Sequence, residues 1–506
     1  MNTPAAHFVS SVLVLTSVAA SAANGIVSFK DADKIKSWDA WGDHLAQVAV
    51  TNILQKEKPC VTMRELKKLS PGAGFKEIGA LATRTSREIK SSNWSVGCET
   101  LDRDYADWDA YKGLLPDLGV KRARFFSGWA KTEQEMNVYD FTWLDPQIRE
   151  CAAMGIKPWI CISYGNPVWG SDFRLGMRVK QVTENPEAMA AWLRYAKALV
   201  ERYKDVVDEW EIWNEPFYQS AHYMRLFYET AKVVKEVQPE AKCYCTAIGW
   251  KANEPDPKSH NEYWCVIDNM TRKGHPEFGS RFIYHPYNAN PDDTFDYMAK
   301  LRAFVKSCSP DYDIYQGEVG CPAQLEFAHA LANLEWTEYS QAKWNLRRTI
   351  GDAAYDVPCN VFTMIDLKYT FMLQSFGLVR SNLLKEFVYR RPSYFAMRNV
   401  FSYFDSEVRG LGVETIETAP WRKLRKATFE RGGQKVHCLW FGEKMPSNRL
   451  SFERVDLARH AGLALKDPVW VELITGRVFA FADLKSVPLW DSPVMVAERS
   501  AVPLAR

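Results

Sequence analysis

Short apolar runs alternate with longer stretches of helical periodicity through the middle of the chain. A buried parallel strand is typically a short apolar run between turn signals, so this alternation predicts a series of βα units. Eight units over about 300 residues have the size of a TIM barrel, and we expect an α/β fold with a (β/α)8 barrel over residues 91–404. The eight expected strands are Trp94–Cys98, Val120–Phe126, Ile156–Ser163, Val207–Trp213, Lys242–Ala247, Arg281–His285, Tyr312–Gly317 and Asn360–Asp366.

The helices expected between these strands carry boundary signals. Asp145 followed by Pro146 predicts an N-terminal cap with proline at the first helical position, and Gly155 predicts the end of that helix. Asn185 followed by Pro186 predicts the start of another helix. The apolar residues of this second helix recur at helical spacing and predict one buried face: Met189, Trp192, Leu193, Ala196, Leu199 and Val200.

The pattern changes after about residue 404, where helical periodicity gives way to short apolar runs separated by turn signals. Such runs occur near Lys435–Phe441, Val469–Ile474 and Pro493–Ala497. We expect a β-sandwich over residues 405–506, as a structural companion of the barrel. Residues 23–90 hold no motif with an assignable chemistry, and we expect an N-terminal extension that packs on the main domain.

The N-terminus has the pattern of an export signal. The segment Phe8–Ala20 is apolar but too short to span a bilayer, and Ala20-Ser21-Ala22 supplies a small-x-small cleavage site. We therefore expect a signal peptide over residues 1–22 and a periplasmic or secreted protein. The 11 cysteines include no Cys-x-x-Cys pair, and several lie in expected strands, which predicts small core residues in place of a disulfide framework.

Composition narrows the range of partners. The formal net charge is +2 and the basic residues are spread along the chain, whereas a nucleic-acid binder needs a basic stripe. No other stretch approaches transmembrane length, so we expect neither nucleic acid nor a membrane as partner. There is no His-Glu-x-x-His, paired Cys-x-x-Cys, phosphate loop or dinucleotide fingerprint, and we expect no metal and no organic cofactor.

Two glutamates stand where the expected fourth and seventh strands end. Glu215 follows Trp213-Asn214, and Glu318 follows Gln316-Gly317. Catalytic groups of parallel barrels lie at the carboxyl ends of the strands, so both carboxylates are expected in one cleft. Glycosidic cleavage needs such a pair, one to protonate the leaving oxygen and one to attack the anomeric carbon. Each motif alone could be a plain turn or a helix cap, but their joint position favours catalysis.

The two motifs resemble those of a known clan. Residues 213–216, Trp-Asn-Glu-Pro, and residues 317–320, Gly-Glu-Val-Gly, look like the acid/base and nucleophile motifs of clan A retaining glycoside hydrolases. The stretch that ends with Arg124-Phe125 resembles the second strand of the clan, which implies that Arg124 contacts the nucleophile. His285-Pro286-Tyr287 resembles the His-x-Tyr after the sixth strand, which implies a hydrogen bond from Tyr287 to the nucleophile.

Within the clan, the sequence is most similar to family 39, the β-xylosidase-like group. This resemblance rests on Val138–Phe141, on the Gly155–Pro158 entry to the third strand, and on the expected C-terminal sandwich. The nucleophile motif looks more like family 5. Phe362 stands in the eighth strand where the clan usually has tryptophan.

Elementary electrostatics assigns roles to the pair. Arg124 and Tyr287 beside Glu318 would favour its ionised form, as a nucleophile requires. We expect the negative charge of Glu318 to raise the pKa of Glu215 and keep it protonated for leaving-group donation. Asn214, which precedes the acid/base, is suited to bind the sugar 2-hydroxyl.

Further residues are candidates for carbohydrate contacts. Glu99 and Asp366 end the first and eighth expected strands and could bind sugar hydroxyls or serve as structural ion-pair partners. His285 could contact the ligand or form a hydrogen-bonded wall. Aromatic rings that follow the second, third and fourth strands could line subsites by stacking on the sugar. They are Trp129, Tyr164, Trp169 and Phe217.

These observations leave three functional hypotheses. The first is a retaining glycoside hydrolase that cleaves β-glycosidic bonds of a plant or microbial oligo- or polysaccharide. The second is a carbohydrate-binding protein without catalysis on a glycosidase scaffold, and the third is a transglycosidase that transfers the intermediate to a sugar. Both Glu215 and Glu318 are present together with Arg124 and Tyr287, which favours catalysis over binding alone.

Overall fold

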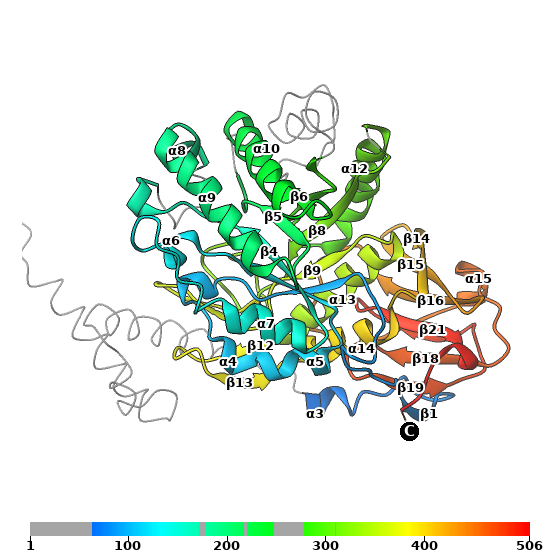
Figure 1. Cartoon of the computed structure of the whole chain (residues 1–506). Coiled ribbons are helices and arrows are strands. Elements are labelled where there is room, and N and C mark those ends of the chain that lie inside the picture. The colour runs from blue at the N-terminus through cyan, green and yellow to red at the C-terminus, as the bar shows by residue number, and fades with distance from the viewer. Residues whose placement is uncertain (1–62, 172–178, 217–219, 247–277, 309, 506) are drawn as a thin grey trace, which may run out of the picture.

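The computed structural model describes residues 63–171, 179–216, 220–246, 278–308 and 310–505 of the chain (Figure 1). The expected signal peptide and Phe217 lie outside these described residues, and so does Ala247, the last residue of the fifth expected strand. Elements are numbered as in Figure 1.

Eight parallel strands close into a barrel, as the sequence predicts. They follow one another in chain order around the barrel, and each lies within two residues of the expected start. The inner cluster of the barrel includes Trp159, Tyr244, Ile283 and Tyr315, all fully buried, so the lumen is a packed core. The strands are β2 (Trp94–Gly97), β3 (Arg122–Phe126), β4 (Lys157–Ile162), β5 (Glu209–Ile212), β6 (Lys242–Thr246), β7 (Arg281–Tyr284), β8 (Asp313–Val319) and β9 (Cys359–Val361).

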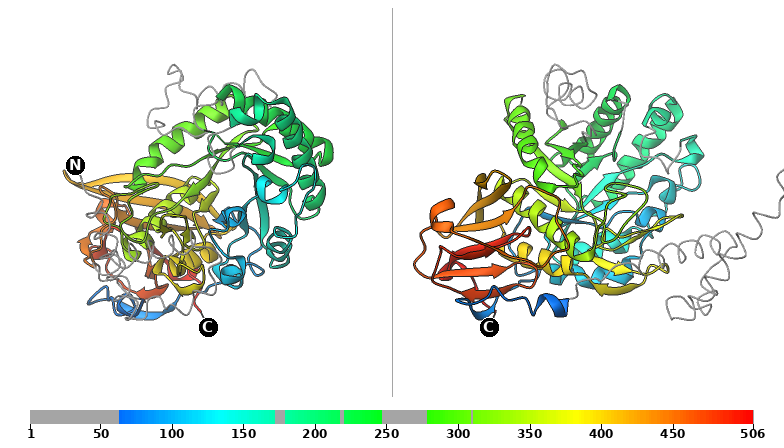
Figure 2. Two further views of the ribbon diagram at one scale, coloured as in Figure 1. Left: turned by 90° about the vertical axis from the view of Figure 1, so that its left-hand side faces the viewer. Right: turned by 180° about the vertical axis from the view of Figure 1, so that it is seen from behind.

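Helices cover the outside of the barrel, as the arc of ribbons in the left view of Figure 2 shows. The Asn185 side chain accepts hydrogen bonds from the backbone N–H groups of Glu187 and Ala188, as expected of a cap. Asp145 is itself the first helical residue, one position later than a cap. The α-helices are α3 (Met63–Leu66), α4 (Trp108–Tyr111), α5 (Leu115–Leu118), α6 (Trp129–Thr132), α7 (Asp145–Ala153), α8 (Val179–Thr183), α9 (Pro186–Tyr203), α10 (Ser220–Val237), α12 (Phe295–Cys308), α13 (Glu338–Ala354), α14 (Pro392–Tyr403) and α15 (Leu457–His460).

The C-terminal part forms an antiparallel β-domain beside the barrel (Figures 1 and 2). Its main sheet has seven strands in the order β1-β19-β18-β21-β16-β15-β14, and β17 pairs separately with β20. The first of these strands comes from the N-terminal extension, since β1 pairs with β19. The strands are β1 (Lys76–Ala80), β14 (Val408–Ala419), β15 (Arg422–Arg431), β16 (Gln434–Phe441), β17 (Glu453–Val455), β18 (Pro468–Glu472), β19 (Arg477–Ala480), β20 (Val487–Leu489) and β21 (Val494–Glu498).

Two small hairpins lie between the barrel and this domain in the sequence. They are β10 (Leu367–Lys368) with β11 (Leu373–Gln374), and β12 (Val379–Ser381) with β13 (Phe387–Arg390). The first of them follows the last barrel strand closely, so its turn is a candidate wall of the cleft at the carboxyl ends of the strands.

Helix α13 joins the two domains and is almost wholly buried. On one side, Arg347 pairs with Asp292 at 2.7 Å, and the indole of Trp440 in β16 donates to the same carboxylate at 2.8 Å. On the other, the Lys343 ammonium pairs with Asp491 of the β-domain at 2.5 Å. Because these charges are buried and paired, the β-domain is fixed to the barrel.

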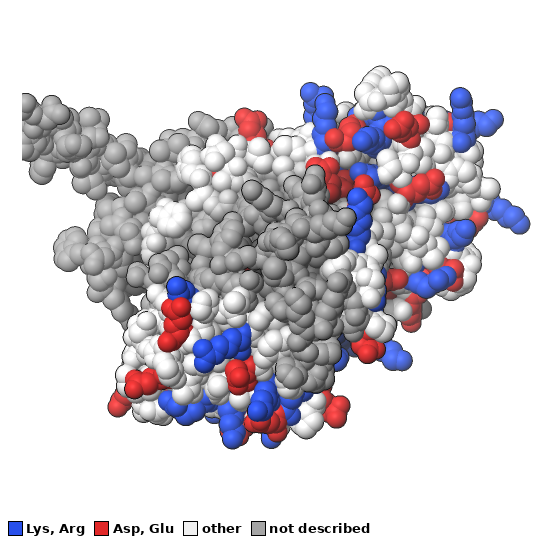
Figure 3. Space-filling model, turned by 90° about the horizontal axis from the view of Figure 1, so that it is seen from above, with Lys and Arg blue, Asp and Glu red and all other residues white. Residues whose placement is uncertain are grey.

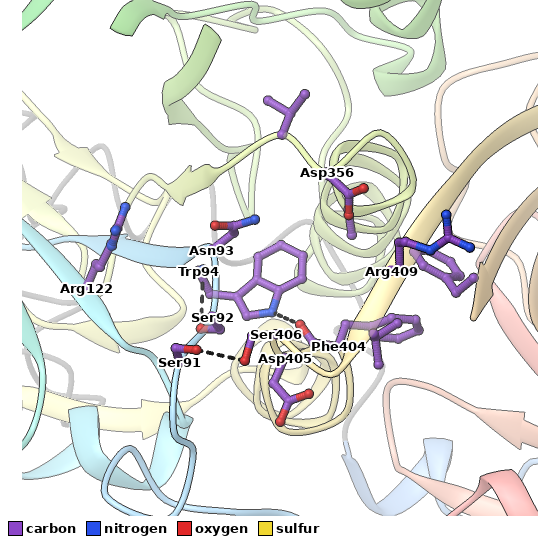
Figure 4. Close-up of a pocket in the computed structure, with 14 residues that line it drawn as sticks. Ser91, Ser92, Asn93, Trp94, Arg122, Asp356, Phe404, Asp405, Ser406 and Arg409 are labelled. Carbon is purple, nitrogen blue, oxygen red and sulfur yellow. Dashed lines mark hydrogen bonds between the residues drawn. The ribbon is translucent and has the colours of Figure 1, made fainter. Parts of the chain in front are cut away.

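A pocket of about 480 Å³ lies at the end of the barrel where strands β2 and β3 begin (Figure 4). The indole of Trp94, at the start of β2, donates to the carbonyl of Phe404 at 2.6 Å, and Ser91 donates to Ser406 at 2.7 Å. Arg122 at its edge is paired with Glu209 at 3.0 Å. Active sites of these barrels lie at the carboxyl ends of the strands, so we assign this pocket to the domain junction.

Candidate active site

The chain turns sharply where β5 ends, and this turn presents Glu215. Trp213 and Glu215 both have left-handed backbone conformations, with φ of 65° and 51°. Such conformations cost about 1–3 kcal/mol at residues other than glycine and persist where the surroundings impose them. The buried ring of Trp213 packs against Trp192 at 5.4 Å and Tyr164 at 5.8 Å, which holds the turn in place.

A bulge in β8 presents Glu318. The register with β9 shifts between Gln316 and Val319, and bulges of this kind redirect a side chain at the rim of a barrel. The glycines of the motif are required by packing. A Cβ on Gly317 would lie 2.1 Å from a side-chain carbon of Ile283, and one on Gly320 would lie 1.9 Å from the carbonyl oxygen of Phe362.

The bulge and the turn bring the two expected catalytic residues together. One carboxylate oxygen of Glu215, one of Glu318 and a ring nitrogen of His285 lie within 4.8 Å of one another. The side chain of Glu215 is 28% exposed and that of Glu318 is 12% exposed. Both carboxylates are therefore open to a ligand at the same place.

Arg124 lies fully buried beneath Glu318 and uses its whole guanidinium group. It donates to Glu318 at 2.9 Å, to Glu99 at 3.1 Å, to both oxygens of Glu211 at 2.8 Å, and to the amide oxygen of Asn214 at 2.8 Å. The contact with the expected nucleophile is thus present. The guanidinium also ties the ends of β2, β3, β5 and β8 into one rigid unit.

The second oxygen of Glu318 accepts a hydrogen bond from Tyr287 at 2.8 Å. Burial raises the pKa of Tyr287 well above its ordinary value, and the adjacent charge of Glu318 raises it further, so the phenol keeps its proton. The ring of Tyr287 packs edge-on against Phe376 at 6.1 Å, which in turn packs on Phe362 at 5.6 Å. Glu318 is therefore held at both oxygens by donors that are themselves fixed.

Burial raises the pKa of Glu215 to about 7, while the guanidinium groups of Arg124 and Arg103 act in the opposite direction. The upward direction agrees with the sequence-based expectation, but the expected cause was wrong: desolvation of Glu215 raises the pKa, and the charge of Glu318 is not among its main causes. A carboxyl with this pKa is protonated in about half of the molecules at neutral pH, as a general acid requires.

His285 contacts Glu215, and its side chain is enclosed by protein. Its Nδ1 lies 2.9 Å from an oxygen of Glu215 and 3.8 Å from one of Glu318, and its side chain is 1% exposed. Burial lowers the pKa of His285 to about 4, so the imidazole is neutral at pH 7. The neutral imidazole of His285 lies close to the carboxyl groups of Glu215 and Glu318, and it orients Glu215 without adding a charge.

Asn214 is bonded on two sides within the protein. Its oxygen accepts from Arg124, and its amide nitrogen donates to the hydroxyl of Tyr164 at 2.7 Å. One amide hydrogen is left for a ligand, and the residue is 5% exposed. This geometry is compatible with the expected contact to a sugar hydroxyl.

Glu99 serves as an ion-pair partner. Its side chain is fully buried against Arg124, and Asn360 donates to the same oxygen at 3.3 Å. Burial raises the pKa of Glu99 to about 7, because Arg124 only partly offsets the desolvation and Glu318 adds repulsion. This enclosed position does not support the expected direct contact with a sugar.

Asp366 belongs to a separate ion-pair cluster. It is paired with Arg391, whose guanidinium also donates to Glu338 at 3.1 Å, and the backbone N–H groups of Gly377 and Ser381 bond to it as well. Both oxygens are used inside the protein, and the residue is 1% exposed. The structural alternative that the sequence left open is therefore the one that this geometry favours.

The two expected subsite tryptophans are anchored by one carboxylate. The indoles of Trp129 and Trp169 donate to Glu133 at 2.6 Å and 3.0 Å. Trp129 is fully buried and stacks on Tyr195 at 5.9 Å, which places its ring in the core, although the residue also lines a pocket of about 530 Å³. Its expected subsite role stays a prediction. Trp169 is half-buried under the guanidinium of Arg194 at 5.5 Å.

The sequence analysis missed Glu211. This carboxylate is fully buried in β5, four residues before Glu215, and receives two hydrogen bonds from Arg124 and one from Thr246 at 2.9 Å. It supplies the negative charge that holds Arg124 in place. A signal was present, since a charged residue inside an apolar strand needs a buried partner.

The cluster of Glu215, His285 and Glu318 is also a possible metal site by distance alone, since three ligand atoms lie within 4.8 Å of one another. The carboxylates already have protein partners in Arg124, Tyr287 and His285. That a metal is not required remains a prediction.

The similarity of this chain to known proteins lies in its fold. No protein-family model matches the chain. Among solved structures, the chain is similar to a family 39 glycoside hydrolase from the gut symbiont Bacteroides cellulosilyticus WH2, with 17% identity, 83% coverage of both chains and a TM-score of 0.62. The chain has the fold of a family 39 glycoside hydrolase. The predicted combination of a (β/α)8 barrel and a β-sandwich is thereby confirmed.

Two further solved structures align less closely with this chain. A GH5_18 protein from Streptomyces cattleya, solved in complex with GlcNAc, has 13% identity, 64% coverage of this chain, 82% of its own, and a TM-score of 0.48. A GH1 β-glucosidase from Exiguobacterium antarcticum B7 has 12% identity, with 61% and 96% coverage and a TM-score of 0.42.

The surface and the cysteines agree with the composition. On the described surface visible in Figure 3, Lys and Arg are interspersed with Asp and Glu. The described part of the chain holds no helix long and apolar enough to cross a membrane. Eight cysteines among the described residues are free and buried, for example Cys161 and Cys359 in barrel strands, as small core residues would be.

Proposed function

We propose that this protein is a retaining β-glycosidase, with Glu318 as nucleophile and Glu215 as acid/base. The observation that carries the proposal is the approach of the two carboxylates to within 4.8 Å at the mouth of the barrel. Retaining enzymes hold these groups about 5–5.5 Å apart, whereas inverting enzymes separate them by about 6.5–9.5 Å to admit a water molecule. The similarity of the fold to a family 39 glycoside hydrolase supports glycosidase activity in general.

The surroundings of the two glutamates differ in the way that the mechanism needs. Glu318 accepts hydrogen bonds from Arg124 and Tyr287, which stabilise a negative charge. In the part of the chain that the structure describes, no Lys or Arg side chain contacts Glu215, and burial raises its pKa to about 7. In the first step, a Glu318 oxygen bonds to the anomeric carbon while Glu215 transfers its proton to the departing glycosidic oxygen.

In the second step, the same residues act in reverse. Glu215, now a carboxylate, takes a proton from water while the water oxygen attacks the anomeric carbon, and Glu318 departs as a carboxylate. Two inversions at the anomeric carbon give net retention. Asn214 is positioned to bind a sugar hydroxyl through its remaining amide hydrogen during both steps.

The test is a panel of 4-nitrophenyl β-glycosides with the product anomer followed by NMR. Turnover of one member with retention, and a slow Glu215→Gln variant, is the expected result. Initial formation of the α-anomer contradicts the double displacement. Transfer products in place of free sugar identify a transglycosidase. Binding of sugars without any turnover, on glycosides and polysaccharides alike, identifies a carbohydrate-binding protein.

Export of the protein is part of this proposal. A glycosidase acting on plant or microbial polysaccharide meets its substrate outside the cytoplasm, and the N-terminal pattern that ends at Ala22 is the supporting feature. Fractionation of expressing cells, with the mature N-terminus determined by sequencing, is the measurement.

A further inference from the structure

Arg103 occupies an unusual position beside the candidate active site. It follows β2, in the short 3-10 turn Leu101–Arg103. Its guanidinium carbon lies 5.2 Å from the ring centre of Tyr105, 5.4 Å from that of Phe126 and 5.3 Å from that of Tyr164. The side chain is 12% exposed. Three aromatic rings therefore hold this cation and remove most of its water.

Among the residues that the structure describes, the Arg103 guanidinium has one carboxylate in contact, that of Asp102. Its Nε contacts Asp102 at 3.4 Å, and its two terminal amino groups make no hydrogen bond to the residues that the structure describes. Lys131 lines the same pocket, but its ammonium pairs with Asp104 at 2.7 Å and donates to the Leu101 carbonyl at 2.9 Å. The two amino groups of Arg103 are thus donors that a ligand can complete.

Arg103 lines an open pocket of about 530 Å³. The segments that follow β2, β3 and β4 line this pocket, so it lies at the catalytic end of the barrel. Tyr164 connects it to the catalytic residues, because one face of its ring meets Arg103 and its hydroxyl accepts from Asn214. Phe126 lies between Arg103 and Arg124, with the latter 5.0 Å from the ring centre.

We propose that Arg103 binds an anionic group of the sugar substrate, so that the preferred substrates are glycosides of acidic sugars. This inference rests on the proposed glycosidase function and deepens it. A planar guanidinium pairs with a carboxylate or a sulfate through two parallel hydrogen bonds, and the aromatic rings around it supply faces for the apolar side of a pyranose. The hydroxyl groups of a neutral sugar can accept from the two amino groups, but they bring no negative charge to the guanidinium.

Binding is measured first, because it does not depend on turnover. Methyl β-glucuronide and β-galacturonide are titrated calorimetrically against methyl β-glucoside and β-galactoside, with the 6-O-sulfated glycosides as a separate arm. The expected result is roughly 100-fold tighter binding of at least one anionic glycoside, the size of one charge-assisted bidentate contact. A carboxylate preference identifies a uronic acid, and a sulfate preference identifies a sulfated sugar.

Variants assign the selectivity to Arg103. Arg103→Met keeps the apolar stem between the rings and is expected to abolish the preference, while Arg103→Lys restores part of it. Asp102→Asn removes the carboxylate that contacts Arg103 among the described residues and is expected to tighten anion binding a few-fold, which a merely structural arginine would not do. Arg194→Met is the matched control, since that guanidinium also lies over an aromatic ring, Trp169, but does not line the pocket.

The experiments distinguish a failure of the proposed role of Arg103 from a failure of the proposed glycosidase function. Neutral and anionic glycosides that bind equally, or a preference that survives Arg103→Met, overturn the role of Arg103. If neutral 4-nitrophenyl glycosides are still hydrolysed with retention in that case, the glycosidase function stands. Anion-selective binding that depends on Arg103, with no turnover of any glycoside, supports the pocket and contradicts the catalytic function.

Discussion

The phenol of Tyr287 donates a hydrogen bond of 2.8 Å to one oxygen of Glu318, while Arg124 donates to the other oxygen. The second oxygen is shared between Arg124 and the cleft. In the proposed mechanism, Glu318 loses its negative charge as the glycosyl bond forms, and the strength of the hydrogen bond from Tyr287 changes with it. Tyr287 therefore has a different effect on the free enzyme and on the covalent intermediate.

We expect Tyr287→Phe to lower kcat/KM by about 10- to 100-fold, the value of one hydrogen bond to a charged group. The fold should be unaffected, since the ring and its packing on Phe376 remain. Steady-state kinetics on an aryl glycoside measure the change. Tyr389→Phe is the control, because that tyrosine also donates to a glutamate, Glu338, in a different part of the fold. Equal effects of the two variants would contradict the assignment.

Glu318→Ala should lower kcat by roughly 10⁴-fold or more, the order found when a catalytic nucleophile is removed. The cavity left by the side chain admits azide, which attacks the anomeric carbon directly. We therefore expect partial rescue by azide and a glycosyl azide of inverted configuration, identified by NMR. Glu201→Ala, on the exposed face of α9, serves as the control. Unchanged activity of Glu318→Ala would remove the nucleophile assignment.

The pH dependence follows from Glu215. Burial raises its pKa to about 7, so the protonated acid is present at lower pH and is lost as the pH rises through 7. We expect kcat/KM for a 4-nitrophenyl glycoside to fall above about pH 7. In Glu215→Gln, this alkaline limb should disappear for a 2,4-dinitrophenyl glycoside, whose leaving group needs no proton. An alkaline limb that persists in the variant would assign it to another group.

Arg124→Met should destabilise the protein by about 3–5 kcal/mol, because it leaves buried carboxylates without their cation. Glu99 and Glu211 are both fully buried against Arg124. Thermal or denaturant unfolding measures the loss, and part of it should be recovered at low pH, where the carboxyl groups are protonated. Arg409→Met removes an exposed pair with Glu430 and should change the stability by less than about 0.5 kcal/mol.

Replacing Trp129 distinguishes a structural role in the core from a role in a sugar subsite. We expect Trp129→Ala to lower the free energy of unfolding by about 3–5 kcal/mol, because a fully buried ring is replaced by a cavity. At a temperature where the variant is folded, KM should stay within about 2-fold of wild type, since the ring stacks on Tyr195 inside the core. Trp421→Ala, with a side chain 66% exposed, is the stability control. A large change in KM alone would support the subsite role.

The barrel could be predicted because its strands are buried on both faces and therefore appear as continuous apolar runs. Strands β14 and β15 were not predicted. No residue of β14 is buried, and its glycines at 410 and 412 interrupt the pattern, so neither a period of two nor an apolar run marks it. Strand β1 was missed as well, because its partner β19 is remote in the sequence.

For the candidate site, sequence motifs predicted which residues lie close together, but they did not predict how deeply each side chain is buried. Glu215, Glu318, Arg124 and Tyr287 were identified because short motifs mark the ends of strands. The burial of a loop residue depends on neighbours from other loops, and the pattern of a single sequence carries no information about those neighbours. This is why the burial of Trp129 was not predicted and why Arg103 received no role.

The pairing of β1 with β19 has a consequence for how the chain acquires its fold. Arg477 in β19 forms an ion pair with Glu77 in β1, across a sequence separation of 400 residues, so the whole barrel lies within the loop that this pairing closes. During synthesis β1 emerges early and must wait for a partner made near the end. Closing so long a loop is slow and non-local. The barrel is thus expected to form first, and the sheet edge to be completed last.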